Sequence, residues 1–293
     1  MSGSLQIEKP PTPPVGPTQD RWDSLAAAEQ EQLGEALLQQ QQDYEDATFP
    51  PESNRHAEAR AELYHSLRGF FGDSGREVYI AAACAVFYPG EPGFTPDLIV
   101  AMDAPTHPRD SWMVAVEHRG LDVVIEVRYQ GSWKKDYVAN VRRYARLGIS
   151  EYFLFDLGSL SLSAFRLPPG GGEYEQVPVR TGRVRSERLG LELGVRRGRL
   201  RFFVHGALVP TAEECLADLA EQEQARADQE QARADSSLAG LRRVLFALLA
   251  QKAVVLPEAQ AALVQDCADP ELLTRWCQRA LAGGEAEAIF GDG

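Results

Sequence analysis

Hydrophobic residues near the N-terminus recur with the spacing of a helix. In residues 53–71 the apolar positions Ala59, Leu63 and Leu67 are four apart, which places them on one face and predicts an amphipathic helix. Residues 23–42 are rich in Ala, Leu and Gln and contain no breaker except one glycine, so they predict an earlier helix. The glycine-containing stretch after residue 71 ends this helical region.

The pattern then changes to short, continuous apolar runs that are typical of buried strands. These runs occupy residues 78–80, 85–88, 98–102, 123–127 and 152–155. Between the last two, residues 134–147 have helical spacing, and Gly148 stands where a left-handed helix terminus is expected. The order strand, strand, helix, strand predicts an α/β fold with a mixed sheet and a crossover helix. Residues 160–167 and 200–204 predict further antiparallel strands.

The C-terminal part returns to helical patterning. Thr211 and Glu214 form a capping box, and two identical heptads, QEQARAD, follow at residues 222–228 and 229–235. Alanine is the only apolar residue in these heptads, whereas a strong coiled coil requires larger side chains at two positions per heptad. We therefore expect a solvated helical spacer, and a dimerising coiled coil is the alternative.

These patterns divide the chain into five segments. We expect a disordered Pro-rich tail, a helical N-terminal segment, an α/β domain, a polar helical spacer and a helical C-terminal region. Their predicted limits are residues 1–20, 21–50, 51–210, 211–237 and 238–293, respectively.

Composition places the chain among cytoplasmic globular proteins. Apolar residues account for 44% of the sequence, yet no apolar run is long enough to span a membrane, and the N-terminus lacks the features of a secretory signal. The four cysteines form no CxxC pair, so we expect reduced thiols.

The charge is unevenly distributed along the chain. The net charge is −13, but residues 121–205 carry +6, while residues 1–120 carry −11 and residues 206–293 carry −8. Many of the central charges are arginines between Arg180 and Arg201. They form either solvated loop and strand faces or a surface that contacts phosphates.

Two carboxylates stand in otherwise apolar strands. Asp97 opens the run LIVAM, and Glu126 lies within VVIEV. Because a buried carboxylate is costly unless it is paired or binds a metal, two acids on adjacent strands predict a Mg²⁺ or Mn²⁺ site. Arg128, Lys134 and Lys135 follow closely and supply cations for a phosphate. This combination suits the hydrolysis of a phosphodiester, because a metal ion lowers the pKa of a bound water.

Structural roles for these residues are the alternative. Asp97 follows a proline and is also placed to cap a strand turn, and Glu126 is close enough in sequence to pair with Arg128 or Lys134. Glu58 and Glu62, on the preceding helix, are additional candidate ligands or members of a solvated face.

Four sequence features resemble one known family. The stretch EVRYQGSWKKDYVANVRRYARLGISEYFLFD, together with Thr95-Pro96-Asp97, PESNRHAEARAEL and LGLEL, resembles the Uma-type restriction endonucleases of the PD-(D/E)xK nuclease superfamily. The similarity spans residues 50–210. It implies that the α/β domain at residues 51–210 is nuclease-like, with a restriction-endonuclease-like mixed sheet flanked by helices. It also implies divalent-metal-dependent cleavage of DNA, with Asp97 and Glu126 as the catalytic metal ligands and Lys134 or Lys135 as the catalytic cation. Because nucleases of this superfamily often act in pairs, it also leaves a homodimer open.

The chain departs from the family pattern at three positions. Arg128 replaces the usual lysine, Asn140 stands where many relatives have a helix lysine, and residues 81–84 read AAAC where relatives have an acid. These departures support a second hypothesis, a catalytically degenerate nuclease fold that binds nucleic acid or a partner protein. A structural adaptor that acts through its C-terminal helices is a third.

Overall fold

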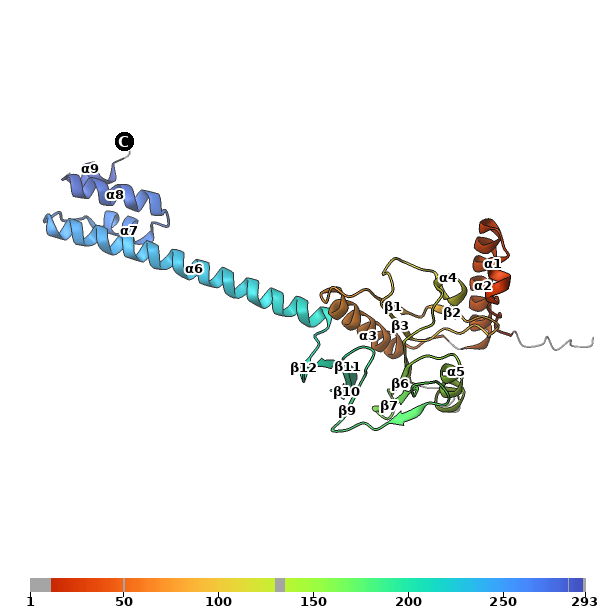
Figure 1. Ribbon diagram of the computed structural model, residues 1–293. Helices are drawn as coiled ribbons and strands as arrows, with labels where there is room; N and C mark the ends of the chain where they lie inside the picture. Colours follow the sequence, from red (N-terminus) through yellow and green to blue (C-terminus); the bar gives the residue numbers. More distant parts are fainter. Residues whose placement is uncertain (1–11, 50, 130–134, 284, 292–293) are drawn as a thin grey trace, which may run out of the picture. The chain divides into compact units, whose positions relative to one another are not determined.

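The computed structural model describes residues 12–49, 51–129, 135–283 and 285–291. The chain divides into two compact units, Met1–Glu213 and Glu214–Gly293. Figure 1 shows the β-sheets and their covering helices in the first unit and a group of helices in the second. Within the described residues, no helix combines the length and apolar composition that a membrane crossing requires.

A six-stranded mixed sheet forms the centre of the first unit. Its strand order is β1-β3-β5-β6-β7-β8, in which only β5 and β6 are parallel neighbours. This arrangement confirms the predicted mixed α/β fold. The strands are β1 (Val78–Ala82), β3 (Leu98–Met102), β5 (Val123–Arg128), β6 (Glu151–Asp156), β7 (Ser161–Arg166) and β8 (Glu175–Val177).

Helix α3 (Asn54–Gly72) covers one face of this sheet (Figure 1). Ser53 caps the helix because its side-chain oxygen accepts a hydrogen bond from the backbone N–H of His56 at 3.3 Å. The predicted apolar stripe holds the helix in place, since Leu63, Leu67 and Phe71 are buried in the core on this face.

The connection from β5 to β6 crosses the opposite face. A π-helical segment (Lys135–Asn140) leads into α5 (Val141–Arg146), and Gly148 follows with a φ of +75°. The predicted helix therefore starts with wider turns than an α-helix, a feature that is frequent at functional sites. Tyr144 of α5 is fully buried against Tyr152 of β6, with ring centroids 5.0 Å apart.

The N-terminal segment differs from the sequence expectation. Ser24 ends a short helix, α1 (Gln19–Asp23), so the longer helix α2 (Ala27–Thr48) starts later and extends further than predicted. Residues expected to be disordered are hydrogen-bonded, because Gly16 donates its backbone N–H to the carbonyl of Glu91 at 2.9 Å. Helix α2 packs on the parallel pair β2 (Ala85–Phe87) and β4 (Ser111–Met113), which α4 (Val114–Glu117) follows.

A second, four-stranded sheet packs into the same core as α3. Its order is β12-β11-β10-β9, with β9 (Arg183–Arg185), β10 (Glu192–Arg196), β11 (Arg199–Val204) and β12 (Ala207–Leu208). Leu193, Leu200 and Phe202 point from this sheet into the core beneath α3. The sequence pattern predicted only β11 of these strands. Strands β9 and β12 are three and two residues long and too short to show an alternation, and β10 is interrupted by Gly194.

The second unit is helical, as the pattern predicted. Helix α6 (Ala212–Gln251) is followed by α7 (Glu258–Asp266), α8 (Pro270–Ala282) and α9 (Ala286–Phe290). A small core of its own includes Leu245, Val264, Leu273 and Trp276. The tandem heptads lie in α6 and are exposed along their whole length.

Candidate active site

The two predicted acids lie at the adjoining ends of β3 and β5. In the antiparallel register Leu98 is opposite Ile125, so Asp97 and Glu126 form the next pair along. The backbone N–H of Asp97 donates to Glu126 Oε2 at 3.2 Å, and the N–H of Val127 donates to Asp97 Oδ2 at 2.7 Å. Each carboxylate is therefore held by a peptide group of the other strand, and the sheet brings the two acids together.

A histidine from α3 completes this group. His56 lies in the first turn of the helix, with Nε2 3.0 Å from Asp97 Oδ2 and 2.6 Å from the carbonyl of Val127. Its Nδ1 is 2.5 Å from Glu52 Oε1. The ligand atoms of Glu52, His56 and Asp97 all lie within 4.8 Å of one another. The group is accessible, since the side chains of His56 and Asp97 are 20% and 12% exposed.

The surrounding carboxylates control the protonation of His56. The hydrogen bond to Asp97 raises its pKa most strongly, against the lowering effect of burial, and the charges of Asp97 and Glu52 raise it further, to about 9. At neutral pH the ring is therefore an imidazolium that donates from both nitrogens. It balances part of the negative charge that the two carboxylates concentrate here.

The donor set fits a divalent cation. Carboxylate oxygens are the preferred ligands of Mg²⁺, and an imidazole nitrogen beside them is also compatible with Mn²⁺. Asp97 and Glu52 each offer a carboxylate oxygen within a small volume, and His56 offers a ring nitrogen only once it has lost a proton. Glu126 accepts a hydrogen bond from the backbone N–H of Asp97. The cluster is thus a candidate metal site.

Glu126 is oriented from its other side by the crossover helix. Tyr144 donates its hydroxyl to Glu126 Oε1 at 2.7 Å, and the amide nitrogen of Asn140 lies 3.5 Å from the same oxygen. Burial, followed by the charge of Glu126, raises the pKa of Tyr144 well above its usual range, so the hydroxyl stays a donor. This contact fixes the rotamer of the carboxylate.

Arg128, which replaces the signature lysine, is engaged with acids other than Asp97 and Glu126. Its guanidinium forms an ion pair with Asp156 at the end of β6, and its Nε is 3.7 Å from Asp136. Burial tends to raise the pKa of Asp156, but the amides of Ser159 and Gly158 and the charge of Arg128 lower it overall. Arg128 thus joins the ends of two parallel strands.

The lysine predictions stay open. Lys134 lies outside the described residues, and Lys135 begins the π-helical segment. One arginine is close to the cluster, since Arg60 Nη2 is 2.8 Å from Glu52 and its Nη1 is 3.8 Å from Asp97.

Sequence reasoning missed Glu52, His56 and Arg60. The spacing of four between His56 and Arg60 places these two residues on one side of the first turns of α3, while Glu52 lies just before the helix N-cap. The two acids considered instead have other positions: Glu58 is exposed, and Glu62 Oε2 accepts from Arg199 at 3.0 Å. Strand β1 ends at Ala82, opposite Leu98, so α3 supplies the side chains nearest Asp97.

Neither of two pockets in the first unit contains these residues. One, of about 710 Å³, lies between the C-terminal half of α3 and β1, and the other, of about 260 Å³, lies on the small sheet. The acidic cluster lies instead at the adjoining ends of β3 and β5, and we call this region the acidic edge of the main sheet.

A mixed sheet with a crossover helix and paired acids at adjoining strand ends defines a restriction-endonuclease-like fold. The family model Uma2, described as "Putative restriction endonuclease", matches residues 45–200, and the chain belongs to this family. One similar crystal structure is "a putative nuclease belonging to DUF820 from Anabaena variabilis ATCC 29413", with a TM-score of 0.40 and 14% identity over 50% of this chain and 80% of that chain. No curated protein matches.

Proposed function

We propose that the protein is a divalent-metal-dependent endonuclease that hydrolyses phosphodiester bonds in DNA. The observation that carries this proposal is the reciprocal hydrogen bonding of Asp97 and Glu126 across β3 and β5, beside His56 and Glu52. Three carboxylates gather here, and His56 and Arg60 balance their negative charge only in part, so a divalent cation would compensate the rest.

Each residue of the cluster has a distinct role. Asp97 and Glu126 hold Mg²⁺ or Mn²⁺, and His56, with Glu52 behind it, fixes the orientation of the Asp97 carboxylate. The bound cation supplies the usual chemistry, a lower pKa for water and charge stabilisation at the phosphate. Tyr144 keeps Glu126 pointing at the strand end.

Lys134 and Lys135 are the candidate cations for the scissile phosphate, with Lys134 preferred. Both lie shortly before Asn140 and Tyr144 in the sequence, the residues that contact Glu126. A lysine provides a compact positive charge that stabilises the transition state. Replacing each lysine by methionine in the full chain is expected to reduce cleavage, more strongly for Lys134.

Cleavage of DNA by the purified chain in Mn²⁺ or Mg²⁺ tests the proposal. Asp97→Asn and Glu126→Gln preserve the shape of the side chains, and their oxygens still accept hydrogen bonds. We expect both changes to abolish cleavage while circular dichroism shows an intact fold.

Glu58→Gln is the matched control. Glu58 is an exposed acid on α3, two residues from His56, and its replacement changes the charge equally. We expect full activity from this variant. Equal, metal-dependent cleavage by wild type, Asp97→Asn and Glu126→Gln would refute the site assignment.

The second candidate function is a degenerate nuclease fold that binds without cutting. It is favoured by Asn140 at the position of the family lysine, where its amide reaches Glu126 only at 3.5 Å. Calorimetric titration with Mn²⁺ separates the two functions. Binding heat that disappears in Asp97→Asn and Glu126→Gln supports the nuclease, and its absence in the wild type supports the binding protein.

Self-association through the tandem heptads stays a prediction. The exposed alanines and glutamines of α6 leave both a spacer and a coiled-coil dimer open. Sedimentation of the full chain and of a chain ending before Thr211 would show whether the C-terminal helices, as in the adaptor hypothesis, set the oligomeric mass.

A further inference from the structure

The small sheet has one apolar face and one basic face. Val184, Leu193, Leu200 and Phe202 alternate inward and are buried in the core. The intervening residues are paired across the strands on the outer face, where Gly194 is opposite both Arg183 and Arg201. This outer face consists of Arg183, Arg185, Glu192, Gly194, Arg196, Arg199, Arg201 and Phe203.

Two arginines of this face stabilise the fold. Arg199 Nη1 is 3.0 Å from Glu62 on α3. Arg201 is buried and donates from Nη2 to the carbonyl of Val209 at 3.1 Å. By contrast, Arg185 and Arg196 are exposed, and neither forms an ion pair among the described residues. The face therefore carries positive charge beyond what its own structure uses.

Arg183 is held flat on the surface. Its guanidinium carbon lies 3.7 Å from the centroid of the Phe203 ring, and Nη1 is 3.3 Å from Glu192. Gly194 makes room for this path, since a Cβ at that position would lie 2.9 Å from Arg183 Cγ. A guanidinium stacked on an aromatic ring loses little entropy when it binds an anion.

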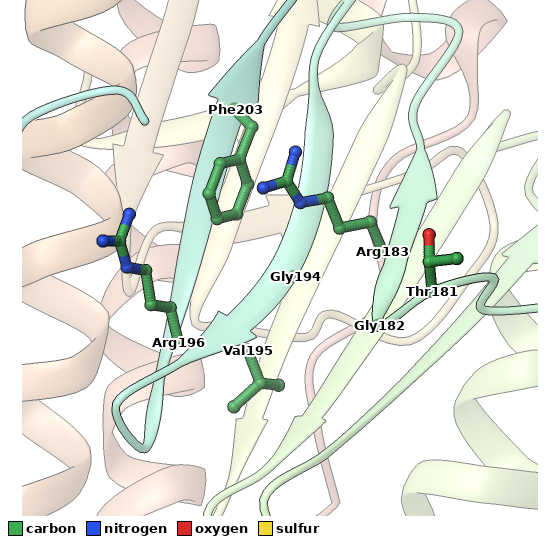
Figure 2. A pocket seen from close by; sticks show the side chains of 7 residues that line it. All are labelled: Thr181, Gly182, Arg183, Gly194, Val195, Arg196 and Phe203. Atoms are coloured by element: carbon green, nitrogen blue, oxygen red, sulfur yellow. The ribbon is translucent and has the colours of Figure 1, made fainter. Parts of the chain in front are cut away.

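Arg183 and Arg196 flank a shallow pocket of about 260 Å³ (Figure 2). Gly194 on β10, two residues before Arg196, has no side chain, so its backbone lines the pocket directly. Figure 2 shows Phe203 between the two arginine side chains and Thr181 at the far side of Arg183. Two guanidinium groups around a small polar hollow form a site for a phosphate group.

This face begins beside the acidic edge of the main sheet. The β10–β11 turn lies close to the β6–β7 turn, since a Cβ added at Gly198 would be 3.9 Å from the side chain of Leu160. Asp156, at the end of β6, is paired with Arg128, two residues beyond Glu126. On the other side Arg199 reaches Glu62, six residues after His56 and about 9 Å along the helix axis.

We propose that the outer face of β9, β10 and β11 binds the phosphate backbone of nucleic acid through Arg183, Arg185 and Arg196. The inference rests on the proposed function for the identity of the polymer. A duplex carries closely spaced phosphates, and cations that neutralise them release counterions. The face would thus hold the segment of DNA that flanks the bond at Asp97 and Glu126.

The test is binding of a fluorescent DNA duplex to the full chain in EDTA, between about 50 and 200 mM salt. The triple variant Arg183→Gln, Arg185→Gln, Arg196→Gln is expected to lose at least about tenfold in affinity at low salt. The slope of log K against log salt should fall by about 2 to 3, because each lost phosphate contact removes about 0.9.

The matched control carries Arg226→Gln, Arg233→Gln and Arg243→Gln in α6. These arginines are exposed, and the net charge changes by the same amount. We expect the wild-type slope. Arg183→Lys retains the charge but not the planar stack, so it should retain the slope and lose about threefold to tenfold in affinity. Thermal melting confirms that each variant is folded.

An unchanged slope and affinity in the folded triple variant would overturn the inference. Absence of DNA binding by the wild type would also overturn it, and binding of polyglutamate instead would assign the face to an acidic protein. Cleavage assays separate this result from the proposed function. At subsaturating DNA, cleavage that depends on Asp97 but not on the three arginines removes only the inference, whereas arginine-dependent binding without any cleavage removes only the nuclease.

Discussion

The acidic edge of the main sheet and the basic face of the small sheet use charge in different ways. At the edge, Asp97 contacts His56, which contacts Glu52 in turn, and Arg128 is paired with Asp156. On the face, five arginines accompany a single glutamate. The carboxylates of the edge are held by hydrogen bonds and by His56, whereas Arg185 and Arg196 on the face form no ion pair among the described residues.

The difference follows from burial. A half-buried charge must have partners, because losing one leaves a desolvated group, so the edge can hold its acids only in a network. Exposed ion pairs contribute little to stability, and exposed arginines are therefore available for an external anion. In the proposed functions, the acidic edge carries out hydrolysis and the basic face attracts the nucleic acid.

The largest expected effect is on the rate of cleavage. With saturating DNA, Glu126→Gln should reduce the rate at least about 10²- to 10³-fold, the scale of losing a main electrostatic contributor to the transition state. Arg196→Gln should leave the saturated rate within a few fold, since it alters binding only. Measurement of rate against DNA concentration separates the two, and a slowed saturated rate for Arg196→Gln would bring the face into the chemistry.

Tyr144→Phe should have a smaller effect on the same acid. It removes only the hydroxyl that Glu126 accepts at 2.7 Å. Loss of such a supporting contact typically reduces activity or metal affinity about 10- to 100-fold. Mn²⁺ calorimetry and cleavage rates should both report the loss, and wild-type values for both would show that Tyr144 does not orient Glu126.

Stability should distinguish the two arginine environments. Arg128→Gln leaves Asp156 without its ion-pair partner and is expected to lower the free energy of unfolding by about 1–3 kcal/mol. Arg196→Gln, on the exposed face, should change it by less than about 0.5 kcal/mol. Urea unfolding measures both values. Equal losses would mean that the basic face is as integrated as the acidic edge.

Acid titration should reveal the smallest effect. Because the pKa of Asp156 is lowered in the folded protein, its charged form adds stability that is present above the unfolded pKa of about 3.9 and lost as the pH falls through the folded pKa. Asp156→Asn lacks this contribution. Its stability should therefore fall less steeply than that of the wild type below about pH 4. Parallel curves would contradict the assignment.

The sequence pattern predicted the long elements well. Strand β3 and helix α3 have strong, regular apolar patterns, and their predicted limits agree with the structure to within one residue. Strands β9 and β12 are only three and two residues long, so no periodicity exists to detect. The helix after β5 was predicted, but its opening π turns gave no signal, because their residue spacing resembles that of an ordinary α-helix.

Likewise, only some of the site residues could be predicted from the sequence. Asp97 and Glu126 stood out because a carboxylate in an apolar strand is unusual, and the structure places them side by side. His56 was not recognised, since only the docking of α3 against β3 and β5 brings it to Asp97. The basic face was visible as an arginine-rich stretch, but only strand pairing shows which arginines share a surface.

The central claim is that Asp97 and Glu126 bind one divalent cation. Crystals soaked in Mn²⁺ and measured at its absorption edge test it directly. We predict a single anomalous peak about 2.0–2.6 Å from an oxygen of each acid, lost in Asp97→Asn. A Mn²⁺ peak elsewhere in the first unit, with both carboxylates keeping only their hydrogen bonds to the opposite strand, would contradict the account.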